Sequence, residues 1–269
     1  MNILFATDKG YLPHVVQCIR SFVRFPREDG YHVYILHSDL TEADTQPLEH
    51  TFSGAVRFHF VYVDPKGLLS FPESDRYPGQ IYYRLFAAFL LPPEVERILY
   101  LDGDITIINP LEELYSMDFA GKDILACTHI RKFLNKMNRM RLGIREARPY
   151  INSGVMLMNL KALREHQDPR EIVQYVQRHK NVMTLPDQDI IIGLYGGRVG
   201  LIDTMRYNLS DRILSIYNTE HPTDRKDLDW VRENAVVIHY CSRKKPWQDD
   251  YKGVLDVFYR EIEASGFGS

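Results

Sequence analysis

The feature that most constrains the fold is the alternation of short apolar runs with amphipathic segments along the first half of the chain. The predicted strands are rich in branched and aromatic residues and cover residues 2–7, 32–36, 56–63, 98–101 and 124–127. Segments with helical spacing lie between them, at residues 14–25, 40–51, 80–90 and 111–117. This alternation predicts an α/β fold with a mostly parallel central sheet and helices on both of its faces.

Beyond residue 127 the pattern is less regular. An apolar segment covers residues 150–160, helices are predicted at 164–179 and from Pro186, and a final helix at about 252–263. No linker, repeat or low-complexity tract interrupts the chain, so we expect one domain over residues 1–269.

Composition and charge restrict the class of protein. The net charge of −3 does not favour a nucleic-acid partner. Cys18, Cys127 and Cys241 are odd in number and lack metal-ligand spacing, which predicts free thiols in a reducing compartment. No run approaches the roughly 18 apolar residues of a transmembrane segment, and the first residues do not resemble a signal peptide. We therefore expect a cytoplasmic protein.

Two carboxylates, Asp102 and Asp104, directly follow the apolar run at residues 98–101, with only Gly103 between them. Ligands of open α/β sheets bind beyond the carboxyl ends of the strands. Two carboxylates this close repel each other, and one takes up a proton unless a cation neutralises both. Mn²⁺ or Mg²⁺ meets this need and commonly carries a substrate phosphate as a further ligand. A solvated turn is the alternative, because Asp and Gly both favour turns.

Two further residues offer groups that suit such a site. His239 follows the apolar run at residues 235–238, and its imidazole is a natural third ligand for Mn²⁺. Lys245 precedes Pro246 and Trp247 and offers a point charge for a diphosphate. The alternatives are a hydrogen-bonded structural histidine and a solvated surface lysine.

Taken in order, several segments resemble family 8 retaining glycosyltransferases, a group that includes bacterial lipopolysaccharide galactosyl- and glucosyltransferases and glycogenin. The segments are FATDKGY (5–11), YYRLFAAFLLP (82–92), ILYLDGDITI (98–107), INSGVMLMNL (151–160), LPDQDIIIG (185–193), RYNLS (206–210) and HYCSRKKPW (239–247). The resemblance covers nearly the whole chain. It implies a GT-A-type nucleotide-diphospho-sugar transferase fold.

The resemblance also implies substrates and a cofactor: a UDP-hexose donor carrying galactose or glucose, a glycan or glycolipid acceptor, and Mn²⁺ with Mg²⁺ as the alternative. It implies a location in the cytoplasm, in solution or at the inner face of the membrane. The metal ligands on this chain would be Asp102, Asp104 and His239. The donor would be contacted by Ala6, Asp8 and Tyr11 at the uridine, by Arg84 and Gly103, and by Lys245 at the phosphate.

By the same resemblance, Asn152, Asp187 and Gln188 would surround the transferred sugar, with Gln188 near the reacting face of the anomeric carbon. Asp187 and the Gln188 carbonyl would supply negative dipoles to an oxocarbenium-like sugar. An amide is a poor nucleophile, so we expect front-face attack, in which the departing phosphate oxygen accepts the acceptor's proton. The alternatives are a helix N-terminal carboxylate for Asp187 and a surface amide for Gln188.

Two residues depart from the family pattern: Gly10 replaces an Asn of the first loop, and Ser242 replaces a Gly near the carboxyl end. Both departures concern donor preference and affinity. The segment at residues 129–149 is rich in Lys and Arg and suggests a lid over the donor and an anionic acceptor. The cations concerned are Arg131, Lys132, Lys136, Arg139 and Arg141.

Other functions are compatible with parts of the sequence. Asp-Gly-Asp-Ile-Thr at residues 102–106 also matches the nucleophile motif of haloacid-dehalogenase-like phosphatases, although that motif normally ends the first strand. A non-catalytic UDP-sugar-binding scaffold is a second alternative, and self-glycosylation on one of the tyrosines is a third.

Overall fold

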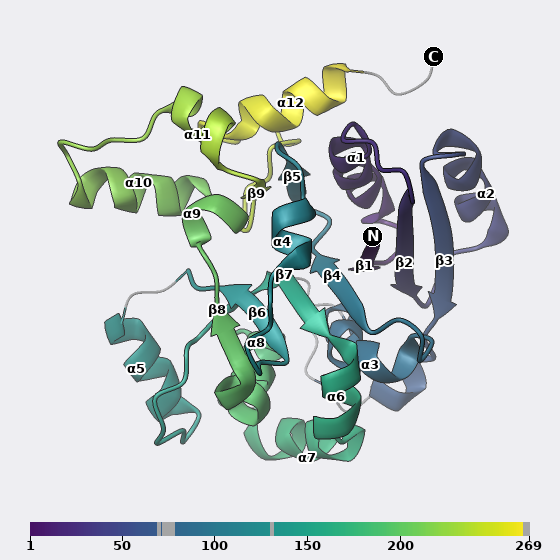
Figure 1. The fold of residues 1–269 in the computed structure, drawn as a ribbon. Helices are drawn as coiled ribbons and strands as arrows, with labels where there is room; N and C mark the ends of the chain where they lie inside the picture. Colours follow the sequence, from purple (N-terminus) through teal and green to yellow (C-terminus); the bar gives the residue numbers. More distant parts are fainter. Residues whose placement is uncertain (69–70, 72–78, 130–131, 266–269) are drawn as a thin grey trace.

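A seven-stranded sheet runs through the computed structural model, which describes residues 1–68, 71, 79–129 and 132–265. The strand order is β3-β2-β1-β4-β7-β6-β8 (Figure 1). β3, β2, β1 and β4 are parallel to one another, β7 is antiparallel to both β4 and β6, and β6 and β8 are parallel. The mostly parallel sheet predicted from the sequence is confirmed. Its strands are β1 (Asn2–Ala6), β2 (Tyr31–His37), β3 (Val56–Tyr62), β4 (Arg97–Leu101), β6 (Ile124–Cys127), β7 (Asn152–Asn159) and β8 (Val199–Leu201).

A separate two-stranded ribbon joins distant parts of the chain. β5 (Ile105–Ile107) pairs antiparallel with β9 (Val237–His239), and the register sets Ile105 opposite His239. Because Asp104 directly precedes Ile105, this pairing brings the Asp-Gly-Asp turn beside His239.

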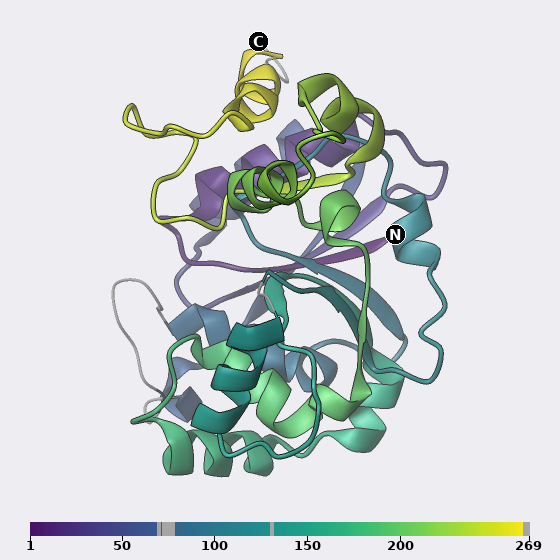
Figure 2. The same cartoon turned by 90° about the vertical axis from the view of Figure 1, so that its left-hand side faces the viewer.

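Helices cover both faces of the sheet (Figure 2). One layer contains α1 (Leu12–Val23), α10 (Asp211–Glu220), α11 (Leu228–Asn234) and α12 (Asp256–Ala264). The other contains α5 (Lys132–Arg141), α6 (Leu160–His166), α7 (Pro169–His179) and α8 (Pro186–Ile190). The remaining α-helices are α2 (Glu42–Thr51), α3 (Ala87–Leu90), α4 (Glu112–Ser116) and α9 (Thr204–Tyr207).

The alternation of side chains along the strands divides the core into two parts. In β1, Ile3 and Phe5 belong to the cluster that includes Phe22 of α1, whereas Leu4 belongs to the cluster on the opposite face, which includes Val176 of α7. All of these side chains are buried. The central strands are apolar on both faces because each face is covered by helices.

Two predicted helices differ in the structure. The helix expected at residues 164–179 is two helices, since Asp168 caps the backbone N–H of Arg170 and Pro169 begins α7. The helix expected at residues 80–90 begins as a 3₁₀ helix, Gly79–Phe86, and only its end is α3.

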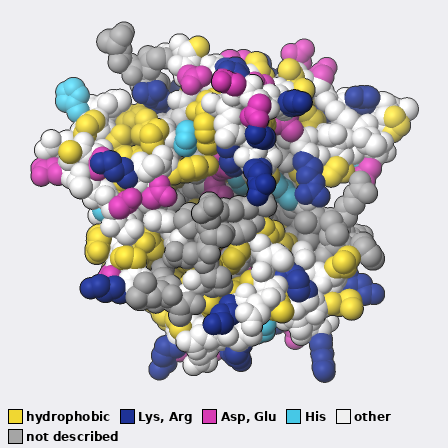
Figure 3. All heavy atoms as spheres, turned by 180° about the vertical axis from the view of Figure 1, so that it is seen from behind, with side chains coloured by type: hydrophobic (Ala, Val, Ile, Leu, Met, Phe, Trp, Pro, Cys, Tyr) yellow, Lys and Arg dark blue, Asp and Glu magenta, His cyan; other side chains and the backbone are white. Residues whose placement is uncertain are grey.

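The surface mixes charges of both signs with apolar side chains, as the face in Figure 3 shows. Among the helices that the structure describes, none combines the length and the apolar character needed to cross a membrane.

Candidate active site

A cavity of about 560 Å³ opens beyond the carboxyl ends of β1 and β4, where the sequence predicted the site. Every residue predicted for the site lines this cavity: Ala6, Asp8, Tyr11, Arg84, Asp102, Gly103, Asp104, Asn152, Asp187, Gln188, His239 and Lys245. The fold therefore brings together groups from six of the segments that resemble the family. Ser242, which the sequence analysis linked to donor affinity, lines the cavity too. The fold also adds lining residues that the sequence reasoning missed, namely Thr7, Gln80, Ile81, Ser153, Leu185, Cys241 and Arg243.

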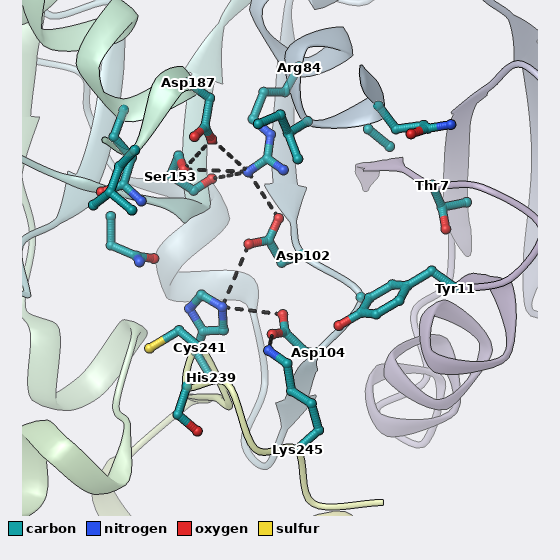
Figure 4. Close-up of a pocket in the computed structure, with 18 of the residues that line it drawn as sticks. Thr7, Tyr11, Arg84, Asp102, Asp104, Ser153, Asp187, His239, Cys241 and Lys245 are labelled. Atoms are coloured by element: carbon teal, nitrogen blue, oxygen red, sulfur yellow. Dashed lines mark hydrogen bonds and ion pairs between the residues drawn. The ribbon is translucent and has the colours of Figure 1, made fainter. Parts of the chain in front are cut away.

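Asp102, Asp104 and His239 form an acidic cluster with one imidazole. Residues 102–104 make a turn between β4 and β5, and both carboxylates converge on the histidine (Figure 4). His239 Nε2 lies 3.6 Å from Asp102 Oδ2 and 3.3 Å from Asp104 Oδ1. One ligand atom from each residue lies within 4.8 Å of the other two, which is a suitable arrangement for a metal ion.

The imidazole of His239 is held by a buried asparagine. His239 Nδ1 lies 2.9 Å from Asn208 Oδ1, so Nδ1 donates a hydrogen bond to the amide oxygen, and Nε2 faces the two carboxylates. The Asn208 amide nitrogen donates to Asn152 Oδ1 at 3.0 Å, which fixes the orientation of the amide. Asn208 belongs to the RYNLS segment, and the resemblance of that segment to the family was the feature of the sequence that pointed to this residue.

Replacing Asn208 with Ala is expected to lower the affinity for Mn²⁺ about 10- to 100-fold, because His239 loses the partner that fixes its tautomer and ring orientation. Calorimetric titration with Mn²⁺ measures this effect without turnover. Asn234→Ala, which removes an exposed amide at the end of α11 bonded to the Trp230 carbonyl, is the control and should match the wild type. Equal affinities for all three proteins would contradict the role of Asn208.

Arg84 connects the acidic cluster to Asp187. Its Nη1 lies 3.0 Å from Asp102 Oδ1 and 3.3 Å from Asp187 Oδ2, and its guanidinium lies over the Tyr100 ring at 4.4 Å. Burial alone would lower the pKa of Arg84, but Asp102 and the neighbouring acidic groups outweigh it and raise this pKa. Its Nε atom is buried, and none of the residues that the structure describes accepts a hydrogen bond from it. Arg84 is thus a fixed positive charge at the cavity wall.

Asp187 lies in the first turn of α8 and is almost fully buried. It accepts a hydrogen bond from Ser153 Oγ at 2.6 Å, in addition to the ion pair with Arg84. Burial raises the pKa of Asp187 above its ordinary value, and Arg84 and Ser153 offset only part of this effect. Gln188 lines the cavity beside it.

Lys245 is paired with a carboxylate of the cluster. Its ammonium contacts Asp104 Oδ2 and donates to the Tyr240 carbonyl at 2.8 Å. Burial alone would raise the pKa of Asp104, but Lys245 and His239 hold it well below its usual range. Asp104 is therefore ionised, and its negative charge is available to bind a cation.

Packing requires a glycine at position 103, which the sequence reasoning did not foresee. The resemblance implied only that Gly103 contacts the donor. In the structure, a Cβ atom there would lie 2.9 Å from Val15 and 3.1 Å from the Tyr11 ring. The absence of a side chain thus allows α1 and Tyr11 to pack against the turn, while Asp8 Oδ1 accepts from the Tyr11 N–H at 2.7 Å.

His129 is a half-buried histidine behind the cluster. Its Nε2 donates to the Asn208 carbonyl at 2.8 Å, and its Nδ1 lies 3.6 Å from Cys241 Sγ. Burial, with a smaller contribution from His239, lowers the pKa of His129 to about 4. Since an unfolded histidine titrates near 6.5, unfolding takes up a proton between these two values, and stability falls as the pH decreases through this range.

Replacing His129 with Gln is expected to remove this pH dependence, because glutamine donates to the Asn208 carbonyl and does not titrate. Between pH 7 and pH 4 the wild type should lose about 3 kcal/mol more unfolding free energy than the variant. Urea unfolding measured at several pH values checks this. Curves that stay parallel over the whole range would contradict a neutral His129.

The fold and the acidic cluster at the carboxyl edge of the sheet define a GT-A-type glycosyltransferase. The family model described as glycosyl transferase family 8 matches residues 2–251, and the chain belongs to this family. The resemblance stated from the sequence is therefore confirmed, and the phosphatase alternative is wrong.

Named relatives and a solved structure agree with this assignment. The chain is 24% identical to the lipopolysaccharide 1,2-glucosyltransferase of Escherichia coli K12, over 92% of this chain and 72% of that protein. It is 23% identical to general stress protein A of Bacillus subtilis, over 94% of this chain and 89% of that protein. The crystal structure of the galactosyltransferase LgtC with donor and acceptor sugar analogs has the same fold, with a TM-score of 0.82 and 24% identity, covering 100% of this chain and 97% of that one.

Proposed function

We propose that this glycosyltransferase moves a hexose, galactose or glucose, from UDP to a hydroxyl of a glycan or glycolipid, with retention of the anomeric configuration and with Mn²⁺. The observation that carries the proposal is one cavity holding the Asp102–Asp104–His239 cluster together with Arg84 and Asp187. The names of the relatives support a hexose donor and a cell-surface acceptor.

The residues present fit a divalent cation. Two carboxylates and one imidazole nitrogen converge, and Nδ1 of that imidazole is already engaged by Asn208. Hard oxygen ligands suit Mg²⁺ and Mn²⁺ alike, and the nitrogen ligand favours Mn²⁺. When bound, the ion would supply positive charge to the departing diphosphate. Lys245 adds charge at the same place, since its ammonium borders the same carboxylates.

The other lining residues receive the rest of the donor. Ala6, Asp8 and Tyr11, at the end of β1 and the start of α1, are proposed to hold the uridine. Asn152, Asp187 and Gln188 lie beyond Arg84 and are proposed to surround the sugar. The hydroxyl of the acceptor forms the new bond to the anomeric carbon as the bond to the phosphate oxygen breaks, and that oxygen takes the hydroxyl proton. Asp187 and the Gln188 carbonyl stabilise positive charge on the sugar.

We also propose an anionic acceptor and a lid over the donor formed by residues 129–149, and the structure reduces the number of cations available for these roles. Arg139 donates to the Glu146 carbonyl, and Arg141 is bound to Asp189. Lys136 is exposed, whereas Arg131 and the side chain of Lys132 lie outside the described part of the chain. We also propose a cytoplasmic location, in solution or at the inner face of the membrane.

The test is calorimetric titration of the wild type with UDP, with Mn²⁺ and after chelation, followed by turnover of UDP-galactose and UDP-glucose. We expect UDP binding that requires the metal, and transfer to an acceptor with retained configuration by proton NMR. UDP binding that needs no metal and gives no turnover would favour the scaffold alternative. A stepwise hexose gain in intact mass without added acceptor would instead identify self-glycosylation. No binding of UDP at all would refute the proposal.

A further inference from the structure

A second carboxylate of α8, Asp189, is completely buried and surrounded by donors. Its Oδ2 accepts from the backbone N–H groups of Thr184 and Leu185, at 2.8 and 3.3 Å. Its Oδ1 accepts from the Tyr150 hydroxyl at 2.7 Å. Asp189 does not line the cavity, so its interactions do not serve a ligand directly. They tie the segment that precedes α8 to the helix itself.

The charge of Asp189 is matched by one cation, which comes from the last residue of α5. Arg141 binds the carboxylate through two nitrogens: Nη1 lies 2.9 Å from Oδ2 and Nη2 lies 2.8 Å from Oδ1. Arg141 also donates to the Val182 carbonyl, just before the segment that Asp189 holds. Two-pronged pairs of this kind fix the relative orientation of their partners, which a single charge does not.

The position of Asp187 and Gln188 depends on this arrangement. They lie immediately before Asp189 in α8, Pro186–Ile190, which continues directly into a π-helical segment, Ile191–Tyr195. Leu185, whose N–H is held by Asp189, lines the cavity and packs on the cluster formed by Leu142, Tyr150 and Ile192. Asp187 and Gln188 lie in the first turn of this helical segment, and the orientation of that turn is set by tertiary contacts.

We propose that Arg141 is a positioning residue for the transfer reaction: by holding Asp189, it fixes α8 so that Asp187 and Gln188 face the bound sugar. This proposal rests on the function proposed above. It also gives the basic character of α5 a role different from acceptor recognition, since this cation is directed inward. Displacement of reacting groups by about 1 Å costs on the order of 100-fold in rate.

The first test measures how firmly α8 is held, by amide hydrogen exchange and without turnover. In Arg141→Gln, amide hydrogen exchange at residues 184–190 should become at least about tenfold faster, while the affinity for UDP with Mn²⁺ stays within about twofold. Arg170→Gln is the matched control, because it makes the same change in another two-pronged Arg–Asp pair, an exposed one with Asp168. Unchanged exchange in Arg141→Gln would overturn the proposal.

The second test uses kinetics. Arg141→Gln should lower kcat for hexose transfer about 10- to 100-fold with little change in the KM for the donor, and Arg141→Lys should recover only part of the loss. Introducing Arg141→Gln into Asp189→Asn should add little, because the two residues act as one unit. A lower melting temperature with an unchanged kcat would show a merely structural pair and overturn the proposal. If the wild type turns over no UDP-hexose, the proposed function is refuted, and so is the catalytic part of this inference. Faster hydrogen exchange in Arg141→Gln would still establish that Arg141 holds α8.

Discussion

Replacing Asp104 with Asn is expected to abolish Mn²⁺-dependent binding of UDP, with a loss in affinity of more than about 100-fold. At metal sites, loss of a residue that only orients a ligand through a hydrogen bond already costs about 10- to 100-fold in affinity, and here a ligand itself loses its charge. The substitution also leaves Lys245 and His239 without the carboxylate that they both contact. Calorimetry with and without Mn²⁺ measures the effect, and hexose transfer should fall in parallel.

The control for Asp104→Asn is Asp249→Asn, which removes one carboxylate from an exposed position of the carboxyl-terminal loop. It should bind UDP as the wild type does. If Asp104→Asn kept its metal-dependent affinity, the acidic cluster would be a network of ion pairs and hydrogen bonds only, with Lys245 and Arg84 as its permanent cations.

Replacing Gly154 with Ala is expected to displace Asp102 and His239 within the acidic cluster. A Cβ atom at this position would lie 2.6 Å from Asp102 Oδ2 and closer still to the His239 ring. The His239 ring has little room to move away because it is buried, and the Asp102 backbone N–H, bound to the Gly154 carbonyl at 2.8 Å, keeps this backbone close to the cluster. We expect a loss of about 1–3 kcal/mol in unfolding free energy from overpacking. Affinity for Mn²⁺ should fall at least about tenfold.

Gly197→Ala provides the matched control. The same methyl group there meets no atom within 4 Å, so unfolding free energy should change by less than about 0.5 kcal/mol. Urea unfolding and Mn²⁺ titration of the two variants separate a local effect on the cluster from a general effect of alanine. If Gly154→Ala kept wild-type affinity and stability, the close contact of this backbone with His239 and Asp102 would be disproved.

The sequence predicts the strands of the sheet well because each combines an apolar run with branched and aromatic residues. It does not predict that β7 runs antiparallel between β4 and β6, since an apolar run carries no information on direction. The break between α6 and α7 was present in the sequence, as Asp168 followed by Pro169, but the helical periodicity across residues 164–179 concealed it.

Most of the polar residues that line the cavity were predicted because short polar motifs follow strands or begin helices at the carboxyl edge of the sheet, whereas neighbours such as Gln80 and Ile81 were not. The supporting residues were harder to find. Gly154 and Asn208 act through contacts with His239 that depend on the fold, and their chemistry in isolation suggests only a strand and a turn. Arg141 was assigned to an acceptor on the basis of charge alone, because the sequence does not show that a buried aspartate faces it.

The pairing of β5 with β9 has a consequence for the order in which parts of the structure form during folding. His239 is separated from Asp104 by about half of the chain, and only the pairing of Ile105 with His239 brings them together. Contacts between residues so far apart require a large loop to close and tend to form late. During synthesis, the cluster cannot exist until residue 239 has left the ribosome, whereas β1 to β4 are available much earlier. An affinity for Mn²⁺ would therefore report that β5 and β9 have paired, which secondary structure content alone does not.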